Sequence, residues 1–251
     1  MAINHELWHE ASGRSFRKWP CPSCTAGTFD LVEGGIQSHE TTASKKGRDL
    51  DPCESYWFEK KFSAFLKCQS CGEIAVASGR ISMQMHEDYD RQTGEPEMFH
   101  TEYYTIKSIY PSPPIFAIHA AFPEKVAKEL KDAFSNFWSD HSACANSIRR
   151  TIEAVMFEQG MKTASKAGKP IVLDCQITEY EKNSPDIAVL LRGIKWHGNY
   201  GSHVTDAPLS KRDLLEGFEV LEHALESIYI KGGERIRDLA EQMTRNKGKP
   251  Q

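Results

Sequence analysis

The spacing of apolar residues changes along the chain. Between about residues 20 and 110 they occur in short, partly alternating runs, a pattern typical of β-strands with one buried face. The predicted strands cover residues 28–32, 56–67, 74–77 and 81–85. Two polar stretches, residues 39–52 and 87–97, predict an insertion loop and a second loop. The sequence therefore predicts a β-rich domain over residues 1–108.

Beyond this domain the apolar period becomes that of amphipathic helices. The segment 109–114 is rich in proline, and each proline disfavours helical backbone at the residue before it, so an extended domain boundary is predicted there. The predicted helices cover about residues 123–137, 142–159, part of 171–182, 184–194 and 210–228, with a charged tail helix after Gly233. Pro185 suits the first turn of the fourth helix, and Ser210 with Asp213 resembles a capping box at the start of the fifth. Residues 109–251 are thus predicted to form an all-α bundle of four or five helices, and the fold class is α+β.

Two Cys-x-x-Cys pairs lie in the β-rich part, Cys21 with Cys24 and Cys68 with Cys71. Each pair places two thiolates on one tight turn, and two such turns can close a tetrahedron around Zn²⁺. The separation of the pairs is about twice the usual one, so the insertion 39–52 is expected to loop out between them. The alternative is two unrelated reduced pairs on the surface. The spacing favours a structural zinc ribbon.

The charge, hydrophobicity and cysteine content of the chain limit the classes of protein and the cellular compartment that we expect. Lys and Arg number 31 against 35 Asp and Glu, a net charge of −4, which argues against nonspecific coating of nucleic acid but not against a local basic groove. No apolar run approaches the roughly 20 residues that span a bilayer, so no membrane segment is expected. Seven cysteines cannot all pair, and the N-terminus does not resemble a secretory signal, so we expect a reducing cytoplasm. Cys144 and Cys175 are predicted to lie in or near the helical core.

The sharpest string in the helical half is Ile194-Lys195-Trp196-His197-Gly198-Asn199-Tyr200-Gly201-Ser202-His203. It falls between two amphipathic helices, and its glycines, Asn and Ser are poor helix formers. The sequence therefore predicts a loop or helix junction at residues 194–203. Such a junction is a candidate functional site, because local propensity alone does not account for it.

This string resembles the signature of the family called domain of unknown function 4145, whose members carry a Lys-Trp-x-Gly-Asn-x-Gly-Ser-His-like run. The resemblance extends to residues 110–114, 145–153 and 221–229 and covers about residues 103–230. An N-terminal zinc ribbon is a frequent attachment in that family. The family is similar to the HEPN class of helical domains, which occur in toxins, restriction systems and antiphage defence, and many of which are metal-independent ribonucleases.

The resemblance implies an HEPN-like bundle that binds or cleaves nucleic acid, RNA above all, in an antiphage-defence or toxin-like system. We also expect a homodimer formed through the helical domain, and a protein partner from the same system. If the protein is an enzyme, the resemblance implies a metal-independent endoribonuclease. The alternative is a non-catalytic dimerising scaffold with a structural zinc. Fold resemblance alone does not decide between them.

HEPN nucleases use an Arg-x(4–6)-His motif, and two registers compete for it here. The imidazole can activate the ribose 2′-hydroxyl or protonate the leaving oxygen, while the guanidinium stabilises charge on the phosphate. Arg192 and His197 meet the spacing directly. The register that follows the family signature instead uses Asn199 and His203, and we prefer it because it preserves the flanking residues of that signature.

In the family register Gly198 stands where the arginine should be, so another residue must supply the cation. Lys195, one turn earlier, and Arg149, on the preceding predicted helix, are the candidates. The structural alternative is that Asn199 caps a helix, His203 binds a backbone carbonyl, and Arg149 forms an i,i+4 ion pair with Glu153.

Overall fold

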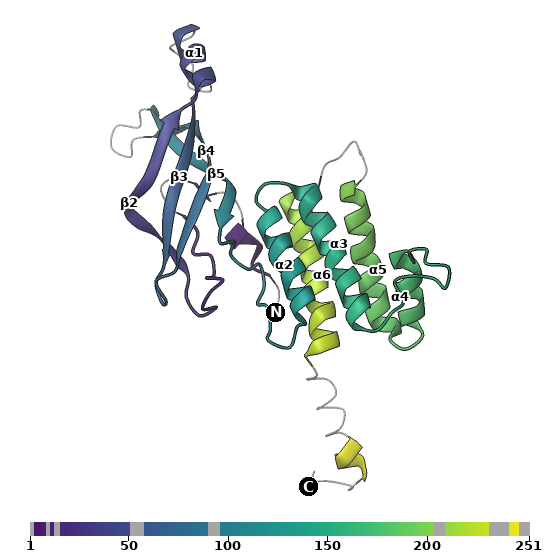
Figure 1. Ribbon diagram of the computed structural model, residues 1–251. Helices are drawn as coiled ribbons and strands as arrows, with labels where there is room; N and C mark the ends of the chain where they lie inside the picture. The colour runs from purple at the N-terminus through teal and green to yellow at the C-terminus, as the bar shows by residue number, and fades with distance from the viewer. Residues whose placement is uncertain are drawn as a thin grey trace. The chain divides into compact units, whose positions relative to one another are not determined.

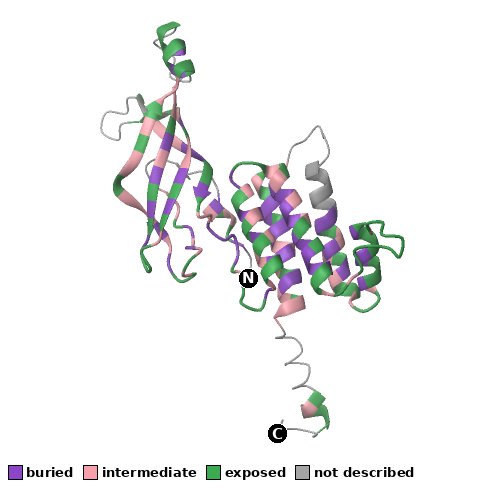
Figure 2. Cartoon of the chain, viewed as in Figure 1, coloured by how far each residue is buried: buried purple, intermediate pink, exposed green. Residues whose placement is uncertain are grey.

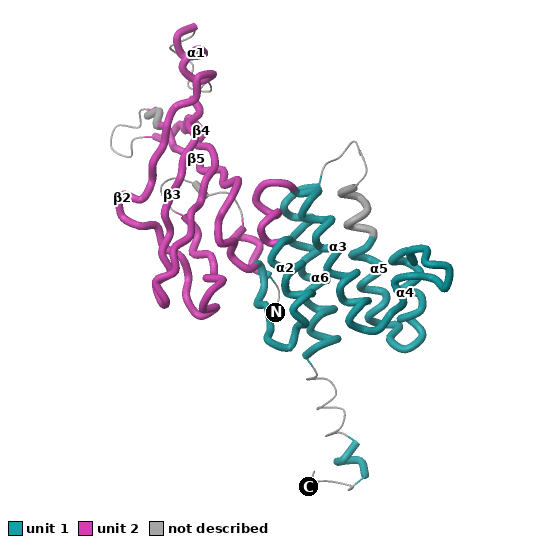
Figure 3. Tube along the Cα trace, in the orientation of Figure 1, with its two compact units in different colours: residues 1–3, 115–133, 141–251 teal, residues 4–114, 134–140 magenta. Residues whose placement is uncertain are grey.

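The computed structural model describes residues 3–8, 11–12, 16–50, 58–89, 96–202, 209–230 and 241–245. It is an α+β protein, as predicted, with an antiparallel sheet followed by a helical region (Figure 1). The chain divides into two compact units (Figure 3). The sheet unit holds residues 4–114 and 134–140, and the helical unit holds residues 1–3, 115–133 and 141–251.

The sheet is antiparallel throughout, in the order β1-β5-β4-β3-β2. Its strands are β1 (Ala11–Ser12), β2 (Phe29–Glu40), β3 (Glu59–Cys68), β4 (Ile74–Tyr89) and β5 (Pro96–Tyr110). The two strands predicted at 74–77 and 81–85 are one strand, and β5 was not predicted. The β4–β5 pairing continues from Val76 opposite Tyr110 to Tyr89 opposite Pro96. Backbone ladder bonds extend this hairpin beyond its buried part, into a stretch where apolar and polar residues do not alternate strictly along the chain.

The insertion loop predicted at residues 39–52 is wrong. Strand β2 continues to Glu40, and helix α1 (Thr42–Leu50) follows at the tip of the β2–β3 hairpin (Figure 1). The Thr41 hydroxyl accepts a hydrogen bond from the Ser44 backbone N–H at 3.1 Å, which caps the first turn. The Ser44 hydroxyl donates to Glu40 Oε1 at 2.9 Å and accepts from the Glu59 backbone N–H at 3.1 Å. Polar residues therefore build the helix start instead of a loop.

One face of the sheet carries the core of the sheet unit, and buried and exposed positions alternate along the strands (Figure 2). The inward residues of the three central strands are Phe62, Ala64, Leu66, Ala75, Ala77, Ile81, Tyr104, Ile106 and Ile109. Aromatic rings cover them: Phe16 contacts Phe62, Tyr104 and Trp19, and Trp19 contacts Trp138. The Trp19 indole N–H donates to the backbone oxygen of Leu7 at 3.0 Å, in the short 3₁₀ helix His5–Trp8.

The helical unit contains the helices that the apolar period predicted. They are α2 (Glu124–Asn136, whose end from Phe134 counts with the sheet unit), α3 (His141–Glu158), α4 (Leu173–Glu181), α5 (Pro185–Ser202) and α6 (Lys211–Tyr229). The predicted capping box at the start of α6 is confirmed: the Ser210 hydroxyl accepts from the Asp213 N–H at 3.2 Å, and the Asp213 carboxylate accepts from the Ser210 N–H at 2.8 Å.

The predicted junction at residues 194–203 is wrong over most of its length, because α5 continues to Ser202. Each helical glycine costs about 1 kcal/mol relative to alanine, but α5 packs against three other helices, α3, α4 and α6. Tertiary packing therefore outweighs the poor propensity of the string. His203 lies outside the described residues.

The two cysteines predicted for the helical core, Cys144 and Cys175, differ in burial. Cys144 is buried on α3, and its Sγ donates to the backbone oxygen of Ala133 at 3.3 Å. Cys175 lies exposed on α4, so the prediction is wrong for it. Within the described part of the chain, no helix is long and apolar enough to cross a bilayer.

Candidate metal centre and charged pairs of the helical unit

The two Cys-x-x-Cys turns have the same local geometry. In the first, the Thr25 backbone N–H donates to the Cys21 oxygen, and in the second, the Gly72 N–H donates to the Cys68 oxygen, both at 3.1 Å. The residue that closes each turn has positive φ, 56° at Thr25 and 79° at Gly72. Glycine adopts this conformation without strain, whereas threonine does so at a cost. The first turn thus reaches the same shape without the glycine that marks the second.

The turns bring the four predicted ligands together. The Sγ atoms of Cys21 and Cys71 are 3.7 Å apart, as are those of Cys24 and Cys68, and all four sulfurs lie within 4.8 Å of one another. A tetrahedral ion with sulfur ligands at about 2.3 Å requires sulfurs about 3.8 Å apart. The four cysteines, here called the cysteine cage, can therefore hold one tetrahedral metal ion.

Backbone N–H groups around the cage favour the ionised thiolate form of its cysteines over the neutral thiol. The Ser23 N–H points at Cys21 Sγ and the Ser70 N–H at Cys68 Sγ, each at 3.4 Å. Gly27 lies against the other side of the cage. A Cβ at this position would sit 2.6 Å from Cys68 Sγ, so only glycine fits without displacing the sulfur.

The sulfurs of the cage influence one another strongly. A hydrogen bond from the Cys71 backbone is the main reason that the pKa of the Cys68 thiol falls to about 6. The backbone of Glu73 lowers the pKa of Cys71, but burial and the three neighbouring sulfurs outweigh it and raise that pKa to about 12. Four thiolates at this distance repel one another, so all four ionise together only with a cation between them.

The cage ties three strands together at one end of the sheet. Cys68 is the last residue of β3 and is the register partner of Phe29, the first residue of β2. The Gln69 N–H donates to the Thr28 oxygen at 3.1 Å, and the Ser23 hydroxyl donates to Glu73 Oε2 at 2.7 Å, just before β4. A metal ion in the cage would hold the N-terminal knuckle and the β3–β4 turn in one arrangement.

The candidate cations of the helical unit are each bound to a carboxylate. Lys195, whose side chain is 8% exposed, lies 2.5 Å from Asp174 Oδ1. Its hydrogen bond lowers the pKa of Asp174. Arg192 binds Glu181 through two hydrogen bonds of 3.2 and 2.9 Å and lowers the pKa of that carboxyl.

Arg149 is paired within its own helix. Its Nε lies 3.4 Å from Glu153 Oε1, so the predicted i,i+4 ion pair is confirmed. His197 and Asn199 lie on α5, but their side chains, like the whole of His203, fall outside the described residues.

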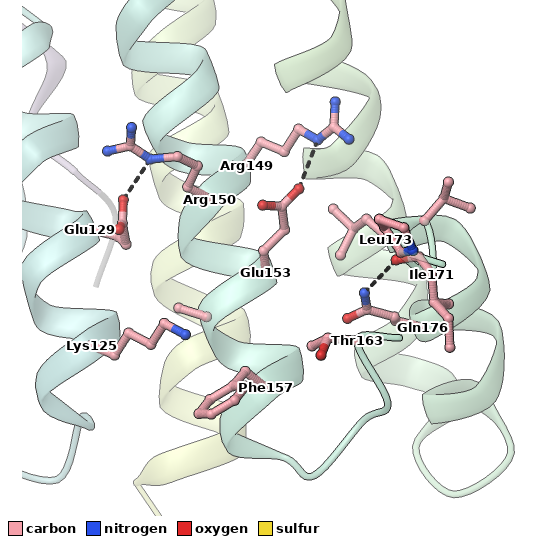
Figure 4. A pocket seen from close by; sticks show the side chains of 13 residues that line it. Lys125, Glu129, Arg149, Arg150, Glu153, Phe157, Thr163, Ile171, Leu173 and Gln176 are labelled. Atoms are coloured by element: carbon pink, nitrogen blue, oxygen red, sulfur yellow. Dashed lines mark hydrogen bonds and ion pairs between the residues drawn. The ribbon is translucent and has the colours of Figure 1, made fainter. Parts of the chain in front are cut away.

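A pocket of about 420 Å³ lies between α2, α3, α4 and the segment before α4 (Figure 4). Arg149 lines it, but Lys195 is not among its described lining residues. Two of its other cations are already engaged: Arg150 Nε lies 2.7 Å from Glu129 Oε2, and Lys125 Nζ lies 3.9 Å from the centre of the Phe157 ring. Sequence reasoning missed this pocket, because its residues come from separate elements with no shared spacing.

Fold and site together define a two-part α+β protein with a four-cysteine cage in its sheet unit. Residues 131–247 match the family model described as Domain of unknown function (DUF4145), the family that the resemblance predicted. Residues 11–107 match a second model, Domain of unknown function (DUF8608), which was not predicted. Comparison with curated proteins and with solved structures gave no significant match.

Proposed function

We propose that the cysteine cage binds one structural Zn²⁺ and that the zinc-stabilised protein binds nucleic acid, RNA in particular, without cleaving it. The observation that carries the zinc assignment is the cage itself, with sulfurs 3.7 Å apart in two pairs. Four soft thiolates in a tetrahedron favour zinc over the harder cations that prefer oxygen. Four protein ligands leave no open position for a substrate, so the role of the ion is structural.

Binding is preferred to cleavage because of what surrounds the candidate cations. Catalysis in the family register needs Lys195 or Arg149 to stabilise charge on a phosphate. Lys195 is held by Asp174, and Arg149 by Glu153. A phosphate would have to compete with these carboxylates. The same pairing favours a second candidate function, a non-catalytic dimerising scaffold formed through the helical unit.

The setting of the protein is proposed on the family resemblance and on cysteine chemistry. The six cysteines among the described residues form no disulfide with one another, which suits a reducing cytoplasm. The HEPN-like reading of the helical unit, and a role in an antiphage-defence or toxin-like system with a partner from that system, rest on the resemblance alone.

The test combines metal analysis with RNA binding and cleavage. We expect one zinc per chain by elemental analysis, and binding of a fluorescently labelled single-stranded RNA measured by anisotropy. We expect the labelled RNA to remain intact on a denaturing gel. Cleavage that is lost in His203→Ala and insensitive to chelators would overturn the non-catalytic proposal in favour of a metal-independent endoribonuclease. Absence of both RNA binding and cleavage, together with a stable dimer, would favour the scaffold.

A further inference from the structure

Three central strands place exposed apolar side chains in a single row. Phe65 of β3 is the register partner of Val76 of β4, and Val76 is the partner of Tyr110 of β5. Register partners in antiparallel strands point to the same face. The three residues are 46%, 38% and 78% exposed, although their neighbours along each strand, such as Leu66 and Ile109, are buried. Two aromatic rings therefore flank a valine on the open face of the sheet.

The rows on either side of this aromatic row are polar and basic. The next row in one direction consists of Ser63, Ser78 and Ser108, and the row beyond it contains Lys61 and Arg80. In the other direction Lys67 lies opposite Ile74. Lys107 is exposed where the β4–β5 register shifts, next to the serine row. Successive rows on one face of a sheet are about 7 Å apart, so a short extended segment of a polymer could contact several of these groups at once.

Lys61, Lys67 and Arg80 on the open face stand against the carboxylates Glu59 and Asp30. Glu59 lies 3.1 Å from Lys61 and 3.8 Å from Arg80, and Asp30, the register partner of Lys67 on β2, lies 3.3 Å from Lys18. In the described part of the chain, neither Lys67 nor Lys107 is in an ion pair, so both remain available to an anion. A chain with a net charge of −4 therefore presents a local cationic surface around exposed aromatic rings.

Exposed rings beside unpaired cations suit a single-stranded nucleic acid. Bases stack on aromatic side chains while cations follow the backbone phosphates, whereas a duplex keeps its base faces covered. The serine row lies between the aromatic row and the row of Lys61 and Arg80, and its hydroxyl groups can form hydrogen bonds with the 2′-hydroxyls that distinguish RNA from DNA. We propose that single-stranded RNA binds across the outer face of β3, β4 and β5, with bases stacked on Phe65 and Tyr110 and phosphates near Lys67 and Lys107. This inference rests on the proposed RNA binding and assigns its site.

The experiment compares variants that keep apolar bulk but remove the ring. Phe65→Leu and Tyr110→Leu in the full-length zinc-loaded protein should each weaken binding of a labelled single-stranded RNA 12-mer about 5- to 150-fold, because one base stack is lost. The matched control is Tyr89→Leu, an equally exposed ring at the far end of β4, which should leave affinity unchanged. Lys67→Gln should reduce the salt dependence of binding by about 0.7 in the log–log slope. Melting temperature and zinc content should match the wild type in all variants.

The outcomes separate this assignment from the proposed function. If the wild type binds no RNA, RNA binding fails, and this site with it. If the wild type binds RNA and both leucine variants bind equally well, only the assignment to the sheet face is overturned. Equal affinity for the matched single-stranded DNA or for duplex RNA would overturn the stated ligand class. If light scattering shows self-association that Phe65→Leu abolishes while RNA binding persists, the face is a contact between two copies of the chain, and the assignment is again overturned.

Discussion

Gly27→Ala tests whether the cysteine cage is as tightly built as the structure indicates. The added Cβ would lie 2.6 Å from Cys68 Sγ and 2.6 Å from the Ser70 hydroxyl oxygen. Ordinary contacts between such atoms are about 3.5–4.0 Å, so either the sulfur or the backbone must move by about 1 Å. The φ angle of Gly27 lies outside the left-handed region, so this contact is the reason that alanine does not fit.

The expected cost is that of overpacking a well-packed site, about 1–3 kcal/mol. Because the displaced atom is a metal ligand, most of this cost should appear in metal affinity, as a decrease of about 5- to 150-fold. Competition with a chromophoric zinc chelator measures the affinity, and thermal unfolding with and without added zinc measures stability. The melting temperature of the variant should fall most when zinc is limiting, since binding to the folded state adds to stability.

Gly34→Ala provides the control. Gly34 has φ of +66° and no atom within 4 Å of the added Cβ, so alanine should cost about 1–2 kcal/mol of backbone strain without touching a sulfur. This variant should be less stable than the wild type but should bind zinc with the same affinity. If Gly27→Ala binds zinc as tightly as the wild type, or if both variants lose affinity equally, the clash argument is refuted.

Three further predictions concern the zinc and the Asp174–Lys195 ion pair. Cys68→Ser should abolish the binding of one zinc ion per chain and destabilise the sheet unit, because the free energy of zinc binding contributes to the folding of that unit. The helical circular dichroism signal should persist. Complete loss of this signal would show that the helical unit does not fold independently. Asp174→Ala should lower the melting temperature because the buried ammonium of Lys195 loses its carboxylate, and the double variant with Lys195→Met should recover much of the loss. Lys195 lowers the pKa of Asp174 in the folded protein, below the value of about 3.9 that an aspartate has in the unfolded chain. The ionised carboxylate therefore stabilises the fold at pH values above the unfolded pKa. This stabilisation is lost as the pH falls through the folded pKa. The difference in melting temperature between wild type and Asp174→Asn should therefore shrink on acidification below pH 4, and a constant difference would contradict the pairing.

The sequence was sufficient to predict those features that depend on interactions between residues close together in the chain. A Cys-x-x-Cys turn, a capping box and a first-turn proline each act within four residues, so the four cysteines, Ser210 with Asp213, and the start of α5 at Pro185 were all predicted correctly. The order of helices followed from the apolar period for the same reason. The family of the helical part was also recognisable, because its signature is a run of adjacent residues.

Tertiary structure decided whatever depends on residues distant in the chain. Helix α5 runs through its glycines because packing against three other helices outweighs their propensity. The polar insertion forms a strand end and a helix, where the Ser44 hydroxyl accepts a hydrogen bond from the backbone N–H of Glu59 on the next strand. The partner of Lys195 is Asp174, a choice made by the packing of α4 on α5. The row of Phe65, Val76 and Tyr110 exists only through strand register, since nothing along the chain relates three residues on three strands until hydrogen bonds align them. The sequence alone therefore specified which residues could bind a metal and where the helices of the helical unit begin. Register and packing determined which side chains meet and which face remains open.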